Sequence, residues 1–264
     1  MEAKPVAIEA ERVTAGYGEP VLREVGLRAR AGELLAVVGA NGAGKSTLLK
    51  VLAGTLLPTN GVVRVFGEPL SGLGRQQIAR CLAVVPQETD VAFGFSVGDV
   101  VMMGRAPHQG GLLLPSAADR AAVARALEEC DLAELSTRSV AELSGGERRR
   151  VTIARALAQE PRILLLDEPA AYLDIGHSLA LFELIRRQTR QRDVAVVAVV
   201  HDLSQVARWA DTVVLLKQGS LHAEGPVGDV MRADLLAEVL GAELVTGADP
   251  DTGLRYFLPV FRPK

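Results

Sequence analysis

The chain has 264 residues, of which 48% are hydrophobic, and its formal net charge at pH 7 is −3. This length and composition suffice for one large α/β domain or two small lobes, and the slightly acidic balance argues against a nucleic-acid binder. The only two cysteines, Cys81 and Cys130, match no metal-ligand spacing, so we expect reduced thiols in a cytosolic protein.

The first third of the chain predicts an antiparallel sheet followed by a strand, a glycine loop and a helix. Up to residue 35, short apolar segments alternate with glycine-rich turns. Residues 34–40 form an apolar run of the right length for a buried strand, and residues 46–54 have helical spacing. Residues 61–67 predict an edge strand, and residues 78–87 end in a strand that Pro86 breaks.

Residues 88–160 predict a mostly helical insert, with apolar residues at helical spacing such as Val123, Leu127 and Leu132. Strands and helices then alternate, which predicts a parallel sheet of βαβ units. The expected elements are a strand in 162–169, a helix in 175–191, a strand in 194–202, a helix in 203–210 and a strand in 211–219. A short helix in 226–241 and a hairpin in 243–260, turning at 249–253, follow.

No segment predicts a membrane span or a signal peptide. The longest apolar run, residues 194–200, is far shorter than the roughly 20 residues that cross a bilayer. The N-terminal decapeptide lacks an apolar stretch. We therefore expect a chain that is soluble by itself and that can dock on a membrane partner.

The strongest chemical signal is GANGAGKST at residues 39–47. It fits the phosphate-loop pattern through Gly39, Gly44, Lys45 and Ser46, between a predicted strand and a predicted helix. In such a loop, backbone N–H groups surround the phosphates, the lysine places a positive charge at the β- and γ-phosphates, and the hydroxyl ligates Mg²⁺. The residues expected to complete the cradle are Asn41, Gly42, Ala43 and Thr47.

The segment ILLLDEP at 163–169 supplies two carboxylates at the end of a predicted strand. Open α/β sheets bind their ligands at the carboxyl ends of strands. We therefore expect Asp167 to hold Mg²⁺ through water and Glu168 to act as the base that polarises the attacking water.

The segment LSGGERRR at 143–150 raises a question of its own. Ser144 and Glu147 fit a capping box, so Ser144 is expected to open a helix whose N-terminus can hold an anion. The arginines at 148–150 are interpreted as the solvated side of that helix. A second phosphate site would seem redundant beside the loop at 39–47.

A family resemblance explains why a second phosphate-binding segment occurs in this chain. GANGAGKST, VVPQE, LSGGE, ILLLDEP, YLD and VVHD occur in this order over essentially the whole chain, which resembles the nucleotide-binding subunit of an ABC transporter. The resemblance implies the α/β P-loop NTPase fold of ABC ATPases, with a parallel core sheet, an N-terminal antiparallel β-subdomain and a helical subdomain. It divides one domain, 1–264, into a core (1–87 and 161–225), a helical subdomain with the signature (88–160), and a C-terminal helix and hairpin (226–264).

The resemblance also implies residue roles. Tyr17 would stack on adenine, Gln87 would reach Mg²⁺ and the attacking water, and His201 would touch the γ-phosphate. Ser144, Gly145 and Gly146 would close over the ATP of a second copy, and Asp174 would contact that copy, giving an ATP-sandwich homodimer. The alternative for Tyr17 is a plain turn residue, and for Gln87 a polar strand end. The remaining histidines, His108, His177 and His222, are interpreted as surface residues.

Three positions depart from the family pattern. Arg149 stands where glutamine is usual, and Ala170 and Ala171 stand where hydroxyl residues are usual. The alanines could loosen contacts between subunits. None of the three replaces a metal or phosphate group, so ATP hydrolysis is still expected.

The stretches at 97–108 and 247–259 resemble the importer branch for iron–siderophore complexes, haem or cobalamin. This resemblance implies two identical ATPase chains beneath two integral-membrane permease subunits that a substrate-binding protein supplies. The chain would then lie on the cytoplasmic face of the inner membrane, held through the permease, with residues 93–110 lining the docking groove beside Gln87. Nucleic acid is not an expected partner.

Three other classes fit less well. DNA-repair ATPases with a signature motif place a long coiled coil between their halves, whereas no heptads occur between Gln87 and Leu143. Translation-factor ATPases of the ABC type carry two cassettes, and this chain carries one. A clamp that binds ATP without hydrolysing it would not need Glu168 and His201.

Overall fold

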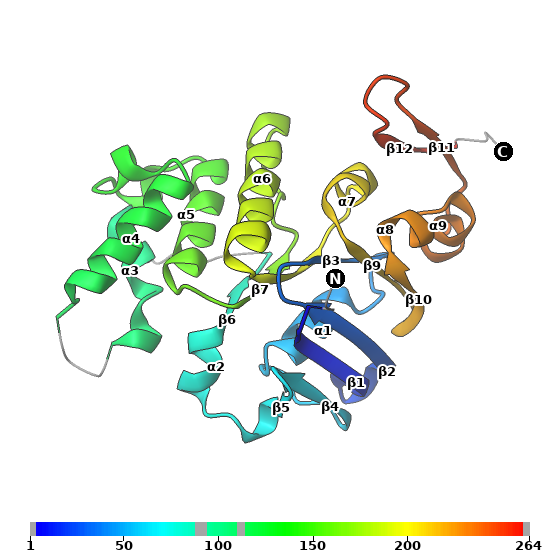
Figure 1. Cartoon of the computed structure of the whole chain (residues 1–264), viewed down its shortest axis with the longest axis horizontal. Helices are drawn as coiled ribbons and strands as arrows, with labels where there is room; N and C mark the ends of the chain where they lie inside the picture. The colour runs from blue at the N-terminus through cyan, green and yellow to red at the C-terminus, as the bar shows by residue number, and fades with distance from the viewer. Residues whose placement is uncertain (1–3, 88–93, 110–113, 261–264) are drawn as a thin grey trace.

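The computed structural model describes residues 4–87, 94–109 and 114–260. An N-terminal antiparallel sheet runs in the order β2-β1-β4-β5 (Figure 1). Its strands are β1 (Val6–Tyr17), β2 (Glu19–Arg30), β4 (Asn60–Val65) and β5 (Glu68–Pro69). The sheet confirms the sequence prediction, but β4 is not an edge strand. Phe66 and Gly67 adopt positive φ angles and turn the chain back, so that β5 pairs outside β4.

The central sheet has the order β10-β9-β3-β8-β7-β6. Its strands are β3 (Leu34–Gly39), β6 (Leu82–Val85), β7 (Ile163–Asp167), β8 (Ala195–Val199), β9 (Thr212–Lys217) and β10 (Ser220–Pro226). All neighbours pair in parallel except β9 and β10. The sequence reasoning missed β10, whose glycine and proline disguise the strand pattern.

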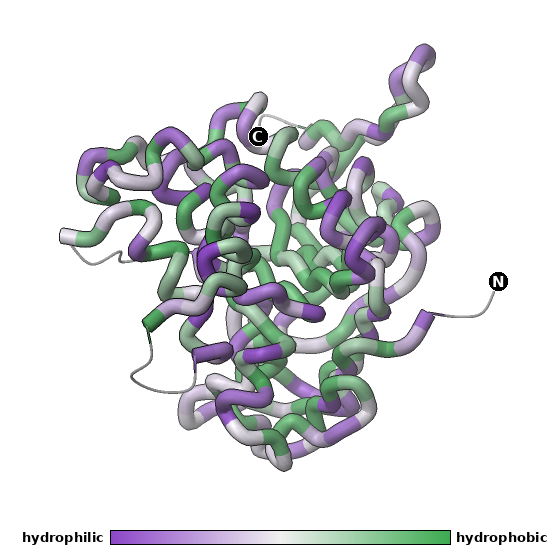
Figure 2. Tube along the Cα trace, turned by 60° about the vertical axis from the view of Figure 1, so that its left-hand side comes forward, coloured by the Kyte–Doolittle hydropathy of each residue, from purple (hydrophilic) through white to green (hydrophobic). Residues whose placement is uncertain are grey.

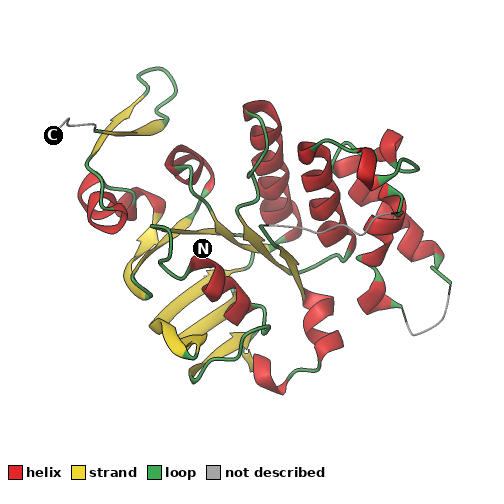
Figure 3. Cartoon of the chain, turned by 180° about the vertical axis from the view of Figure 1, so that it is seen from behind, coloured by secondary structure: helices red, strands yellow, loops and turns green. Residues whose placement is uncertain are grey.

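Both faces of the central sheet are buried. In β3, Leu34, Ala36 and Val38 belong to one apolar cluster, whereas Leu35 and Val37 belong to another. The first cluster packs under helices that include α5 (Gly145–Ala158) and α6 (Ile175–Arg192), and the second packs against α1 (Lys45–Leu52) and the antiparallel sheet. Figure 3 shows these layers from behind, and Figure 2 shows the hydrophobic colour along the central strands. Burial on both faces explains the nearly continuous apolar strand sequences.

The remaining helices flank this core. They are α2 (Arg75–Cys81), α3 (Val97–Met103), α4 (Ala117–Glu129), α7 (Leu203–Trp209), α8 (Val227–Val230) and α9 (Ala233–Leu240). Short 3₁₀ helices cover Leu70–Gly72, Ala106–His108, Ala133–Leu135 and Val140–Glu142. The single helix expected in 226–241 is two helices, because Arg232 is extended between them. The predicted hairpin is present as β11 (Leu244–Ala248) and β12 (Arg255–Pro259).

Within the described ranges, no helix is both long and apolar enough for a membrane span. The expected docking segment 93–110 is partly core, since Val97, Val100 and Val101 are buried. Phe95 and Met103 are exposed, whereas Phe93 and Gly110 lie outside the described residues. The segment therefore has an apolar inner side and a few exposed apolar side chains.

A buried arginine joins the helices of the α3–α5 region. Nε of Arg105 lies 2.9 Å from Asp119, and its Nη1 lies 2.7 Å from the Ala158 carbonyl and 2.8 Å from Glu160. Arg105 and Asp119 are both buried. Hydrogen bonds from Ser116 and Arg105 lower the pKa of Asp119 to about 2. One guanidinium thus links α3, α4 and the end of α5.

Arg105→Met is expected to lower the free energy of unfolding by about 3 kcal/mol, because it leaves a buried carboxylate without its partner. Arg125→Met is the matched control, since Arg125 is half exposed and also pairs with Glu160. The control substitution is expected to lower the free energy of unfolding by less than about 1 kcal/mol. Urea unfolding of both variants measures the difference, and equal losses would contradict the assigned role of Arg105.

Candidate active site

The strand order brings the predicted site residues to one edge of the central sheet. β3, β8, β7 and β6 are consecutive and parallel, so their carboxyl ends lie side by side. The phosphate loop follows β3 and His201 follows β8. Asp167 and Glu168 end β7, and Gln87 follows β6. Residues distant in sequence therefore meet along one edge.

The backbone of the phosphate loop requires glycine at specific points. Gly42 and Gly44 have φ angles of 77° and 98°, in the left-handed region. A Cβ on Gly39 would lie 2.4 Å from the carbonyl oxygen of Leu216 on the neighbouring strand β9. Glycine at these positions keeps the loop compact and leaves the N-terminus of α1 open toward the site.

Lys45 begins α1 and points back into its own loop. Its Nζ donates hydrogen bonds to the carbonyls of Gly39, at 2.8 Å, and Ala40, at 2.9 Å. Burial lowers the pKa of Lys45, and the charges of Glu168 and Asp167 oppose this effect. The loop therefore already holds the ammonium group beside the carboxylates that end β7.

Asp167 offers an unpaired acceptor. Among the described residues, none provides a hydrogen-bond partner for its buried Oδ1. Burial raises the pKa of Asp167, while the Ser46 hydroxyl and the charges of Arg149 and Lys45 lower it. No group of three or more His, Cys, Asp or Glu side chains in the described ranges could hold a metal alone. A hydroxyl and one free carboxylate oxygen suit a hard cation that takes its other ligands from water and phosphate.

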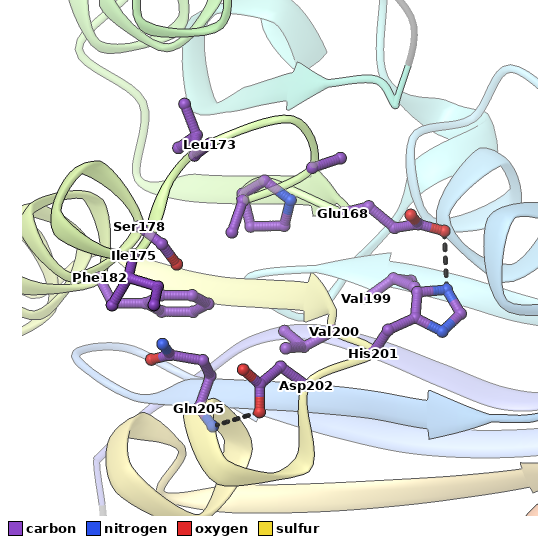
Figure 4. Close-up of a pocket in the computed structure, with 13 residues that line it drawn as sticks. Glu168, Leu173, Ile175, Ser178, Phe182, Val199, Val200, His201, Asp202 and Gln205 are labelled. Carbon is purple, nitrogen blue, oxygen red and sulfur yellow. Dashed lines mark hydrogen bonds and ion pairs between the residues drawn. The ribbon is translucent and has the colours of Figure 1, made fainter. Parts of the chain in front are cut away.

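Glu168 and His201 form a pair across β7 and β8. Oε1 of Glu168 lies 2.7 Å from Nε2 of His201 (Figure 4). Glu168 has a φ angle of 47°, which is unusual for a residue with a side chain, and its N–H donates to the Val199 carbonyl. Both residues line a cleft of about 450 Å³, together with Ala170 and Ala171. Glu168 thus has a backbone conformation of the kind that clusters at functional sites.

Tyr17, which ends β1, and Gln87, which follows β6, are both exposed. The Tyr17 side chain is 62% exposed, and its hydroxyl accepts a hydrogen bond of 3.1 Å from Lys50 on α1. Gln87 is exposed, and its main-chain carbonyl accepts a hydrogen bond from Arg149. Lys50 was not singled out in the sequence, because a lysine within a helix carries no distinguishing signal.

The capping box predicted at the signature segment, residues 143–147, is present. The Ser144 hydroxyl accepts from the Glu147 N–H, and it donates to the Glu147 carboxylate at 2.7 Å. A Cβ placed on Gly145 would meet no atom within 4 Å. Asp174 caps α6 in the same way, and its Oδ2 lies 2.8 Å from Nδ1 of His177.

One interpretation of side-chain exposure was wrong. Arg149 is not on the solvated side of α5. It is 6% exposed, because α5 packs this position against the ends of β6 and β7. None of the three histidines expected at the surface is buried: His177 is exposed, and His108 and His222 are partly exposed.

Comparisons with known proteins agree with this geometry. The family model described as ABC transporter matches residues 22–171. The hemin import ATP-binding protein HmuV of Streptomyces coelicolor is 46% identical over 242 residues, which cover 92% of this chain and 85% of that protein. The cobalamin import ATP-binding protein BtuD of Halobacterium salinarum is 42% identical over 236 residues, 89% of this chain but 59% of that longer protein.

Among solved structures, a chain of a metal-chelate type ABC transporter in an inward-facing conformation superimposes with a TM-score of 0.85 at 28% identity. The match covers 97% of this chain and 98% of that one. Sequence, fold and the order of the site segments agree. The chain therefore belongs to the ATP-binding subunits of ABC transporters.

Proposed function

We propose that the ATPase activity of this family member powers the import of a metal chelate, namely haem, an iron–siderophore complex or cobalamin, through a partner permease. The observation that carries the proposal is the meeting of the phosphate loop, Asp167, Glu168 and His201 at one sheet edge. The substrate class follows the names of the relatives, which import hemin and cobalamin, and of the metal-chelate transporter.

ATP would bind with its phosphates in the loop from Gly39 to Thr47. Lys45 exchanges its two carbonyl partners for phosphate oxygens without moving far, because its ammonium group already lies inside the loop. Adenine stacks on the exposed ring of Tyr17, which Lys50 holds in place. The positive end of α1 adds favourable potential at the phosphates.

Ser46, Asp167 and Gln87 would hold Mg²⁺ beside the β- and γ-phosphates. The unpaired Oδ1 of Asp167 is the structural support for this assignment. When bound, the ion neutralises charge on the phosphates. The residues of the chain align the nucleotide. The carboxylate of Asp167 lies at the end of β7, where the phosphate loop and Glu168, the proposed catalytic base, come together.

Glu168 would orient and polarise the water that attacks the γ-phosphate. Its carboxylate is held by His201, which lies at the end of the adjacent strand. A carboxylate positioned in this way increases the nucleophilicity of a water that it hydrogen-bonds. In this position the imidazole ring of His201 can also contact the γ-phosphate through a ring nitrogen.

The signature segment would complete the site of a second copy. The Gly145 position faces open space, so nothing in its own chain requires glycine there. Nearby Tyr172 and Ile175 are 79% and 80% exposed, an unusual exposure for large apolar side chains. Ser144, Gly145, Gly146 and Asp174 therefore suit an ATP-dependent interface between two copies. Two permease subunits hold this pair at the cytoplasmic face of the membrane.

Glu168→Gln is expected to lower the kcat of ATP hydrolysis about 100-fold or more, because the amide cannot polarise water as a base. Phosphate release by the purified chain measures the rate. Glu183→Gln on the exposed side of α6 is the matched control and should keep the wild-type rate. Equal rates for wild type and E168Q would refute the assignment of the base.

Gly145→Val is expected to abolish the ATP-dependent dimer while leaving the monomer folded. A Cβ at this position meets no atom within 4 Å, so the free energy of unfolding should change by less than about 1 kcal/mol. Gel filtration of E168Q with and without ATP, compared with E168Q carrying Gly145→Val, measures the effect. A dimer that forms equally in both would exclude the signature segment from the interface.

Transport is tested with a partner permease that co-purifies with this chain, reconstituted with it in vesicles. ATP-dependent uptake of hemin, a ferric hydroxamate or cobalamin is expected, and Lys45→Ala should abolish it, because the lysine binds the phosphates. Uptake of a sugar or an amino acid alone would contradict the proposed substrate class.

A further inference from the structure

The side chain of Arg149 makes five hydrogen bonds, and every acceptor is a main-chain carbonyl. Nε donates to Pro169 at 3.0 Å, and Nη2 donates to Asp167 at 2.7 Å and Glu168 at 2.8 Å. Nη1 donates to Pro86 and, at 3.2 Å, to Gln87. The guanidinium therefore donates hydrogen bonds to carbonyls of two separate backbone segments at once, 86–87 and 167–169.

These carbonyls lie where the sheet stops pairing. In the pairing of β6 with β7, the last partners are Val85 and Leu166. Beyond them Pro86 has no N–H to donate, and Glu168 leaves the strand with its positive φ angle. The Arg149 guanidinium lies between the two diverging backbones and replaces the missing ladder bonds. It is a fork of five N–H donors, all of which the carbonyls use.

The two segments carry the groups assigned to the reaction. One presents Gln87, and the other presents Asp167 and Glu168. Arg149 itself lies on α5 four residues after Gly145, so its bonds also fasten the first turns of that helix to the sheet edge. We propose that Arg149 is a positioning residue for ATP hydrolysis, which holds Gln87 and Glu168 in register with the signature segment. The inference rests on the proposed function.

Burial and charge are consistent with this role. The residue is 6% exposed, and burial lowers the pKa of Arg149 while Asp167 and Glu168 oppose that effect. A buried guanidinium without carbonyl partners would be costly, so the side chain and the two turns depend on each other. Misplacement of a catalytic group by about 1 Å can reduce a rate about 100-fold.

No other side chain can reproduce these contacts. Lysine keeps the charge and can reach only part of the five carbonyls with three N–H groups. Glutamine, which the resemblance gives as usual at this position, supplies two N–H donors. Methionine has similar length and supplies none. The series Arg149→Lys, Arg149→Gln and Arg149→Met therefore removes donors stepwise.

The test is steady-state ATP hydrolysis by the purified chain and these three variants, with ATP affinity and urea unfolding measured in parallel. The kcat is expected to fall in the order Lys, Gln, Met, by about 10- to 100-fold for R149M, whereas the Kd for ATP changes less than about threefold. The Kd is preserved because Arg149 touches neither the phosphate loop nor Tyr17. If R149M does not fold, the comparison of R149K with R149Q gives the same order.

Arg105→Met is the control for lost stability. It removes another buried arginine, remote from the carboxyl ends of β6 and β7, and should leave kcat within about twofold at temperatures where it is folded. Arg148→Gln, at an exposed neighbouring position, should match the wild type in every measurement. If R105M lost as much kcat as R149M, the effect would be one of stability, and the proposal would be overturned.

A double variant decides whether Arg149 acts through Glu168. In single-turnover hydrolysis, E168Q with R149M should be within about threefold of E168Q alone, because positioning matters little once the base is absent. A further 10-fold loss would overturn the action of Arg149 through Glu168 and leave only its hold on Gln87, whereas wild-type kcat in R149M would overturn the whole proposal. Equal rates for wild type and E168Q would instead refute the proposed function, so the two failures are distinguishable.

Discussion

The parallel pairing of β3, β8, β7 and β6 is the constraint on which the site depends. Val37 pairs with Val199, Asp167 with Val199, and Val85 with Leu166, so the carboxyl ends of the four strands lie side by side. Successive residues of β3 pack into two different apolar clusters, and a slip of its register by one residue would exchange its two faces. Packing of the core thereby sets the distances between groups from four separate segments.

Several energetically unfavourable features lie at the same edge. Glu168 has its left-handed backbone, Lys45 is a buried cation, and Asp167 has an unpaired oxygen. Each of these costs free energy that the sheet and its covering helices must offset. The strain persists because neighbouring groups hold it on several sides: Val199 binds the Glu168 N–H, and Arg149 binds its carbonyl.

The sequence predicted most of the elements, and it pointed to the phosphate loop and to Asp167 and Glu168 at a strand end, because apolar period and phosphate-loop glycines are local signals. It did not reveal the strand order, nor which arginine of 148–150 is buried, since three consecutive arginines look alike until tertiary packing selects one. The 3.6-residue period of α5 turns position 149 inward, toward carbonyls that only the folded strands create. Likewise β10 depends on pairing with β9 rather than on its own composition. The division into subdomains and the individual site roles stay predictions.

In the proposed function one chain holds two unlike halves of a catalytic site. The half with Lys45 and Glu168 lies at the ends of its own strands, whereas the half at Ser144 and Gly145 faces outward, its hydroxyl engaged only in its own helix cap. A helix N-terminus with free N–H groups is stabilised when it binds an anion on another surface, and the same contact buries the exposed apolar side chains beside it. Because α5 is fastened to the backbone of Glu168 through Arg149, any shift of that helix on contact with a second copy acts on the end of β7 as well. If the proposed roles hold, the physical basis for linking association to hydrolysis is the stiffness of one buried side chain and the carbonyls that it holds.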